Sequence, residues 1–296
     1  MPRAANQLLD DDFLRKIEQL ALVSRKVLAG RMRGERRSRR RGASLEFADY
    51  RDYTQGDDLR FLDWNIAGRL DRLFLKLFLA EEDLRVHVLV DASQSMAFGT
   101  PSKLETAKRI AAALAYIAFC SLESASVLAF AQGPVRHFPL ARGKRRIWRL
   151  FDFLAGLEAA GTTDLAAAAR RFALQRPGKG VVAVISDFLD KNGYEEGLKY
   201  VRGPSYDVFV CQVLSPEEVD PSLEGDLKLV DIEDADTAEV SLTQDLRRAY
   251  RRNLDAYCGG LREFCRKNGF GYLFTTTDRP FDKLVLTYLR TIGVVK

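Results

Sequence analysis

Three oxygen-bearing side chains stand at alternate positions, Asp91, Ser93 and Ser95, directly after the apolar run Leu84–Val90. Carboxylate and hydroxyl oxygens suit a hard cation such as Mg²⁺, which keeps several waters and needs few protein groups. The spacing alone is weakly specific, because Ser or Asp after a strand is more often a turn residue or a helix cap. The segment therefore predicts a metal site only if other groups converge on it.

Two later segments supply groups of the same kind. Asp187 follows a second apolar run, Val181–Ile185, and Thr163 lies in a loop that leads into a helical pattern. In doubly wound sheets, ligands bind outside the carboxyl ends of the strands, where the strand order reverses. If this strand and the strand before Asp91 are neighbours, two carboxylates and three hydroxyls face one point. Taken singly, Asp187 also fits a helix start and Thr163 a helix cap.

The elements that must position these groups alternate between strand and helix from Leu84 onward, which predicts an α/β fold with a doubly wound, mostly parallel sheet. The run Val181–Ile185 is apolar throughout, as is typical of a strand covered on both faces. The predicted strands are Leu84–Val90, Ala125–Phe130, Val181–Ile185, Asp207–Leu214 and Tyr272–Thr275, with an antiparallel edge strand at Val135–Leu140. The predicted helices are Lys103–Leu122, introduced by a cap at Thr100-Pro101, then Arg145–Leu157, Leu165–Ala173, Tyr194–Val201 and Leu246–Lys267.

The chain is expected to divide at residue 83. Residues 1–83 contain an amphipathic helix over residues 8–30, an arginine-rich loop over residues 31–41 and a β-rich extension. Residues 84–296 form the α/β domain, with a hairpin insertion near residues 227–242. In the extension, arginines and aspartates are expected to form an ion-pair cluster that ties it to the main domain: Arg51, Arg60, Asp57, Asp58 and Asp63.

Composition narrows the classes of protein. The four cysteines form no C-x-x-C pair, which favours buried thiols over disulfides or a zinc site, and two histidines leave little for a His-ligated metal or a catalytic triad. No apolar stretch is long enough to span a bilayer, and the N-terminus lacks the apolar core of a secretion signal. We therefore expect a cytoplasmic protein.

The set Asp91, Ser93, Ser95, Thr163 and Asp187 resembles the metal-ion-dependent adhesion site of von Willebrand factor A domains, which are Rossmann-like. The resemblance implies Mg²⁺, or Mn²⁺, touched directly by the three hydroxyls, with the two aspartates acting mostly through water. It also implies a coordination position left open for an acidic side chain of a partner.

A second signature resembles the bacterial domain of unknown function 58. It comprises Gly42-x-x-Leu45-Glu46-Phe47, Tyr50-Arg51-Asp52-Tyr53 and the segment Gly56–Trp64. Members commonly lie beside MoxR-type AAA+ ATPases, although this chain lacks the N-terminal membrane helices of longer members. The resemblance implies a non-enzymatic adaptor or chaperone-type partner of such an ATPase, or of its client.

Two other functions are weighed against this one. A metal-dependent phosphoester hydrolase would need a general base, and the sequence indicates no His or Lys near the site; Ser93 also stands where an aspartyl nucleophile would want a second Asp. Nucleic-acid binding through the arginine-rich loop is disfavoured by the modest net charge of +5 and by the lack of interleaved aromatic residues.

Overall fold

The computed structural model describes residues 12, 14–19, 47–70, 72–78, 85–120, 123–131, 136–175, 180–203, 206–221, 225–230, 237–280 and 283. The chain divides into two compact units, one of Met1–Arg25 and Leu84–Lys296 and the other of Lys26–Asp83. Of the helix predicted over residues 8–30, residues 14–19 are described and are helical, with Ile17 buried. The arginine-rich loop predicted over residues 31–41 lies outside the described residues.

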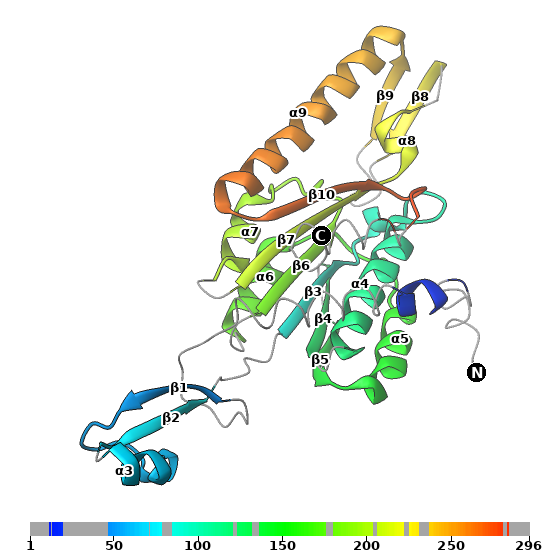
Figure 1. The fold of residues 1–296 in the computed structure, drawn as a ribbon. Coiled ribbons are helices and arrows are strands. Elements are labelled where there is room, and N and C mark those ends of the chain that lie inside the picture. Colours follow the sequence, from blue (N-terminus) through cyan, green and yellow to red (C-terminus); the bar gives the residue numbers. More distant parts are fainter. Residues whose placement is uncertain are drawn as a thin grey trace. The chain divides into compact units, whose positions relative to one another are not determined.

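A six-stranded sheet forms the centre of the larger unit (Figure 1). Its order is β10-β7-β6-β3-β4-β5, and every neighbouring pair is parallel except β4 with β5, which is the antiparallel edge. This confirms the predicted α/β class and mostly parallel sheet. The strands are β3 (Arg85–Asp91), β4 (Ser124–Phe130), β5 (Arg136–Arg142), β6 (Gly180–Ser186), β7 (Tyr206–Leu214) and β10 (Gly271–Thr276).

Helices cover both faces of this sheet, as a doubly wound fold requires (Figure 1). Helices α4 (Lys103–Cys120) and α5 (Ile147–Ala155) lie on one face, while α6 (Leu165–Leu174), α7 (Glu195–Val201) and part of α9 (Gln244–Asn268) pack on the other. The predicted hairpin is present as β8 (Gly225–Val230) and β9 (Thr237–Leu242), which pair antiparallel. The short helix α8 (Pro216–Val219) precedes it.

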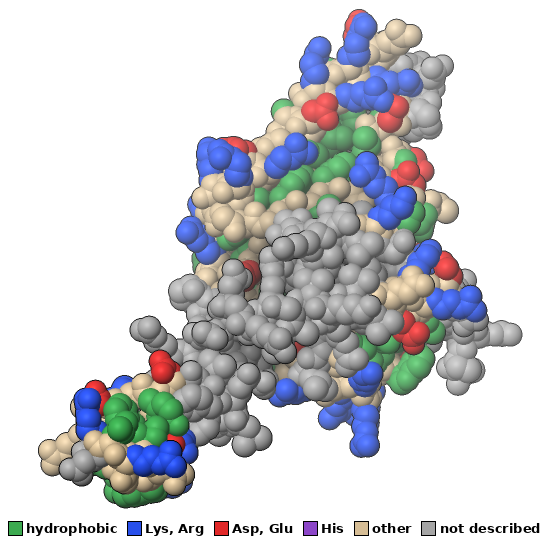
Figure 2. Space-filling view, in the orientation of Figure 1, with side chains coloured by type: hydrophobic (Ala, Val, Ile, Leu, Met, Phe, Trp, Pro, Cys, Tyr) green, Lys and Arg blue, Asp and Glu red, His purple; other side chains and the backbone are tan. Residues whose placement is uncertain are grey.

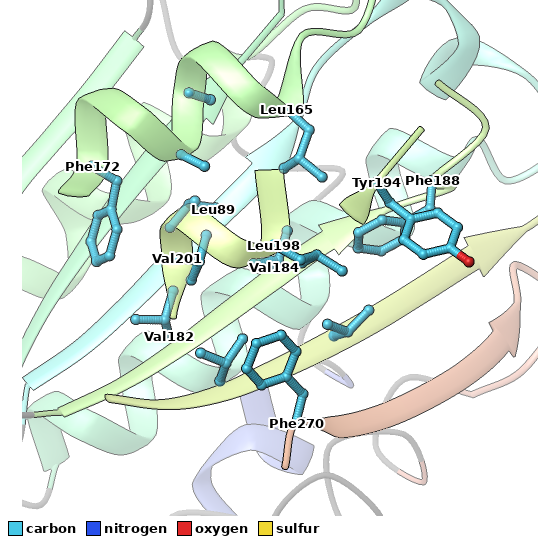
Figure 3. Close-up of a cluster of buried hydrophobic side chains, with 14 of the residues drawn as sticks. Leu89, Leu165, Phe172, Val182, Val184, Phe188, Tyr194, Leu198, Val201 and Phe270 are labelled. Carbon is cyan, nitrogen blue, oxygen red and sulfur yellow. The ribbon is translucent and has the colours of Figure 1, made fainter. Parts of the chain in front are cut away.

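The core on the α6–α7 side is built from alternate residues of adjacent strands (Figure 3). Val182 and Val184 of β6 and Leu89 of β3 point to this face and meet Phe172 of α6 and Leu198 of α7. Each fully buried aliphatic or aromatic side chain contributes about 1.5–3 kcal/mol relative to exposure. The strand ends that carry the polar residues are therefore fixed by a buried apolar layer.

Helix α4 begins at Lys103, as the sequence predicted, but its cap is not the predicted one. The prediction placed its cap at Thr100-Pro101, but the hydroxyl of Ser102 accepts a hydrogen bond from the backbone N–H of Glu105 at 3.1 Å, and the helix starts at Lys103. Ser102 therefore serves as the cap, because its oxygen satisfies one of the N–H groups that the first turn leaves open. Lys103 is thus the first residue of the helix, one position after the cap.

The smaller unit pairs β1 (Phe47–Asp52) with β2 (Phe74–Phe78) and places η1 (Leu59–Phe61) and α3 (Trp64–Leu70) between them. The predicted β-rich extension is thus only partly strand. Its ion pairs are local: Arg51 pairs with Asp57 at 2.7 Å and Arg60 with Asp58 at 2.7 Å. Asp63, expected to join these arginines, instead pairs with Lys76 at 3.0 Å, accepts from Tyr50 and caps α3 through the N–H groups of Asn65 and Ile66.

All four cysteines are free and buried, which confirms the prediction of buried thiols. Among the residues that the structure describes, no helix has the length and hydropathy needed to cross a membrane.

Candidate metal centre

The two strands that end in aspartates are neighbours. Strands β3 and β6 pair in parallel with Val90 opposite Ile185, so Asp91 and Asp187 emerge at the same edge of the sheet. The chain order reverses between these strands, because β4 and β5 continue to one side and β7 and β10 to the other. The edge is therefore the switch point at which ligands bind in this class of fold.

A continuous line of oxygen atoms joins the two loops. The Oγ atoms of Ser93 and Ser95 lie 3.1 Å apart, and Ser95 Oγ donates to Asp187 Oδ2 at 2.9 Å. Ser93 and Asp187 are buried, and Ser95 is half-buried. The short helix η2 (Gln94–Ala97) turns the chain at this point, and this turn lets Ser93 and Ser95 reach the same side.

Asp91 lies behind this line and holds it in place. Its Oδ1 accepts from the backbone N–H of Ser93 at 2.9 Å, and its Oδ2 accepts from the hydroxyl of Ser186 at 2.6 Å. The side chain is fully buried. Burial, and secondly the charge of Asp187, raise the pKa of the Asp91 carboxyl. A cation at this edge would favour the ionised form.

The loop that carries Thr163 is bound to the same turn. The backbone N–H of Gln94 donates to the carbonyl of Gly161 at 2.8 Å, and that of Ala160 donates to the carbonyl of Ala92 at 2.9 Å. Thr163 is buried at 7% exposure. The cap of α6 is Asp164, whose Oδ1 accepts from Ala167 N at 2.8 Å, so the alternative role of Thr163 as the helix cap is wrong.

Asp187 is not a helix-start residue either. It is followed by a turn, in which Leu189 N donates to Asp187 Oδ1 at 3.1 Å, and the next helix begins only at Glu195. Phe188 has a left-handed φ of 59° and buries its ring in the core. The hydroxyl of Ser186 accepts from Phe188 N at 2.9 Å, so the strained residue is held from the Asp91 side.

A buried lysine that the sequence did not reveal contacts this site. Lys103 Nζ donates to Asp187 Oδ2 at 2.7 Å and also to Glu218 Oε1 of α8, and the lysine is only 1% exposed. Burial alone would lower its pKa, but the charges of Asp187 and Glu218 outweigh burial and raise the pKa of the Lys103 ammonium. The expectation that no lysine lies near the site is therefore wrong.

Two further elements fix this ion cluster. Ser215 and Glu218 form a capping box at the start of α8, so the Glu218 carboxylate serves both the helix end and Lys103. From α9, Tyr250 donates to the backbone carbonyl of Glu218 at 2.7 Å and Tyr257 donates to that of Phe188. Helix α9 thus contacts the backbone at Glu218 and next to Asp187, the two acidic residues that Lys103 joins.

The donor set suits a small hard cation. In an octahedral Mg²⁺ shell with bonds of about 2.1 Å, adjacent ligand oxygens lie about 3 Å apart. The Ser93, Ser95 and Asp187 oxygens are linked by hydrogen bonds of 3.1 and 2.9 Å, so they are already close enough to hold one such ion, directly or through water. Among the described residues, no group of three or more His, Cys, Asp or Glu side chains is placed to hold a metal ion, so hydroxyl groups would have to supply much of any such shell.

Sequence signals for the missed residues were present but local. The N-terminal end of a helix dipole favours anions, so a lysine in the first turn of α4 is in an unfavourable position by itself. A lysine at such a position can indicate a buried acidic partner. The segment Ser215-Pro216-Glu217-Glu218 has the spacing of a capping box directly after an apolar strand. Neither pattern indicates that Lys103 and Glu218 meet, because 115 positions separate them.

Known proteins that are similar to this chain include the uncharacterized protein Rv1480 of Mycobacterium tuberculosis, 26% identical over 279 residues, which cover 92% of this chain and 87% of the relative. Among solved structures, similarity extends to the conserved hypothetical protein BatB from Bacteroides thetaiotaomicron, at 17% identity and a TM-score of 0.45 over 71% of this chain and 97% of that one. The SpRpn10 VWA domain is similar at 8% identity and a TM-score of 0.39, over 70% and 95% of the two chains. Residues 49–257 match the family described as protein of unknown function DUF58, and the chain therefore belongs to that family.

Proposed function

We propose that this chain is a non-enzymatic, Mg²⁺-dependent protein-interaction module that acts as an adaptor or chaperone-type partner of a MoxR-type AAA+ ATPase. The site residues in this proposal are Asp91, Ser93, Ser95, Thr163 and Asp187, with Mn²⁺ as an alternative ion. The ATPase assignment rests on the family resemblance of the two sequence signatures. The metal assignment rests on the geometry of the sheet edge.

The observation that carries the proposal is the convergence of the Ser93, Ser95 and Asp187 oxygens, hydrogen-bonded at 3.1 and 2.9 Å, at the switch point of the sheet. Two of these three groups are neutral hydroxyls, and Lys103 already offsets the charge of Asp187. A divalent cation held by such groups keeps positive character, and it would supply a Lewis-acidic position for a carboxylate. An acidic side chain on the partner is therefore the expected ligand.

The chain's own residues position that contact and leave little chemistry for catalysis. Ser186 and the Ser93 N–H hold Asp91, while the Gln212 amide donates to the Asp187 carbonyl at 3.0 Å. Lys103 is a cationic side chain in contact with the site, and its two carboxylate partners keep it protonated. A protonated lysine cannot act as a general base, which weighs against a phosphoester hydrolase.

The first experiment measures metal binding. Calorimetric titration with Mg²⁺ and Mn²⁺ should show modest, chelator-sensitive binding by the wild type and none by the Ser93→Ala, Ser95→Ala double variant. Ser124→Ala is the matched control, because Ser124 is a half-buried serine at the opposite end of the sheet. Equal binding by the double variant and the control would remove the metal assignment.

The second experiment tests the partner and the hydrolase alternative in one preparation. Pull-down of a MoxR-type ATPase should require Mg²⁺, and should be lost with chelator or in the double variant but not in Ser124→Ala. Phosphate release from a model ester should stay at background in the same samples. Turnover that survives purification and disappears in the double variant would instead establish the hydrolase.

A further inference from the structure

A second functional surface lies at the other end of the central sheet. The stretch from the end of β5 to the first turn of α5 includes η3 (Lys144–Arg146) and presents five exposed cationic side chains within eight residues. Lys and Arg side chains project at this end of the unit in Figure 2. We call this surface the basic end; it consists of Arg142, Lys144, Arg145, Arg146 and Arg149.

Acidic residues are scarce in this stretch of the sequence. Asp152 is the one acidic residue between positions 142 and 152. Within the part of the chain that the structure describes, Lys144, Arg145, Arg146 and Arg149 form no ion pair. Like charges this close repel one another. Because no acidic side chain among the described residues pairs with these four cations, binding of a polyanion would relieve the repulsion.

A large aromatic side chain stands in the middle of the basic end. Trp148 is 60% exposed, and its ring meets buried Phe151 edge-on with centroids 6.0 Å apart. One edge of the indole is therefore fixed by the core while the rest faces solvent. Burying an exposed Trp contributes strongly to binding, and its amphipathic ring favours the boundary between apolar and aqueous phases.

The basic end lies far from the candidate metal centre. Arg142 at the end of β5 pairs with Ser124 at the start of β4, whereas Asp91 pairs with Phe130 at the end of β4. Six residue steps along a strand correspond to about 20 Å. A large surface bound at the basic end would thus leave the candidate metal centre facing away from it.

We propose that the basic end docks peripherally on an anionic membrane surface, with Arg and Lys side chains at the lipid phosphates and Trp148 inserted at the headgroup level. Most of the cations lie on η3 and on the first turn of α5, at one end of the unit. Cations grouped at one end can contact a broad, flat layer of phosphates together. A single-stranded nucleic-acid surface would call for several aromatic rings in succession, and the basic end offers one. This proposal stands independently of the metal site.

The test uses Trp148 as its own reporter. The chain has two tryptophans, and Trp64→Phe leaves Trp148 as the sole indole emitter. Trp64 is 67% exposed at the start of α3 in the other unit, so its replacement should be tolerated. Emission of this variant should shift to shorter wavelength with vesicles of phosphatidylcholine and phosphatidylglycerol in equal parts, and should not shift with phosphatidylcholine alone.

Charge variants in the same background supply the controls. Each cation near an anionic bilayer contributes about fivefold to partitioning, so Arg145→Gln with Arg146→Gln should weaken vesicle binding roughly 30-fold. Arg251→Gln with Arg252→Gln removes equal charge from an exposed face of α9 and should leave binding unchanged. Added salt should weaken binding by screening.

Three results would overturn the proposal. These are an absent shift with anionic vesicles, an equal shift with neutral vesicles, and unaltered binding of the Arg145→Gln, Arg146→Gln variant. Stronger modulation of Trp148 emission by single-stranded DNA than by anionic vesicles would assign the surface to nucleic acid instead. Circular dichroism of each variant checks that the fold is retained.

Discussion

Replacing Lys103 with Met would remove the buried cation between Asp187 and Glu218. The methionine fills much of the same volume, but both carboxylates then lose their buried countercharge. Breaking a buried ion pair from one side costs about 3–5 kcal/mol, because the remaining charge stays desolvated. For a unit of more than 200 residues, this loss lowers the melting temperature by roughly 10 °C.

Divalent metal should reverse part of this loss. A bound Mg²⁺ would give Asp187 a new countercharge, and it would no longer be repelled by the Lys103 ammonium. We therefore expect Mg²⁺ to raise the melting temperature of Lys103→Met more than that of the wild type, with affinity increased at least about tenfold. Thermal unfolding in chelator and in graded Mg²⁺, followed by circular dichroism, measures both quantities.

Lys108→Met is the matched control. Lys108 belongs to the same helix and is part-buried, but its ammonium donates to the backbone carbonyls of Ala155 and Leu157 instead of to carboxylates. Its loss should cost less, and Mg²⁺ should not restore it. Two results would refute the reasoning: a Lys103→Met variant as stable in chelator as the wild type, or equal metal-dependent gains in the Lys103→Met and Lys108→Met proteins.

Three further predictions concern other parts of the larger unit. Burial lowers the pKa of His87 to about 4, so between the unfolded value near 6.5 and pH 4 only the unfolded chain takes up the proton. Stability should fall by up to roughly 3 kcal/mol as pH drops through this window, and His87→Phe should flatten that part of the profile in chemical denaturation. Burial raises the pKa of the Cys211 and Cys265 thiols to about 12, so thiol reagents should label them in denaturant but not in the native protein, as mass spectrometry would show. Ser215→Ala should cost about 0.5–2 kcal/mol by removing the α8 cap, measured as a shift in denaturation midpoint.

The strands and their order follow from local pattern and a few topological rules. An unbroken apolar run such as Val181–Ile185 is typical of a central strand in a sheet that is covered on both faces. In the structure this run lies in β6, a central strand that is buried throughout. Pairing of β3 with β6 then brings Asp91 and Asp187 to one edge. The antiparallel edge strand was also predicted, and its exposure is that of an edge, because Phe138 is the one buried residue of β5.

What escaped prediction depends on partners distant in the sequence. In the sequence, Lys103 looks like a solvent-exposed helix residue, because its partner Glu218 lies far along the chain in α8. The helix cap was predicted at Thr100-Pro101, whereas the structure has it at Ser102. Helix α3 was missed because its short apolar pattern is irregular, and it depends on Asp63, which satisfies its first N–H groups. The roles of Ser93, Ser95 and Thr163 toward a metal remain predictions.

The two tyrosine contacts of α9 bear on where the chain can be shortened. Tyr250 and Tyr257 are seven residues apart, about two helical turns, and so project from one side of α9 toward Glu218 and Phe188. The family match ends at residue 257, in the middle of this helix. A fragment that ended there would keep both tyrosines but would lose Leu261 and Cys265 from the core together with strand β10. We expect the half of α9 that remains to unfold without this packing. Fragment boundaries for biochemical work therefore belong beyond residue 276, outside the span that sequence matching alone would suggest.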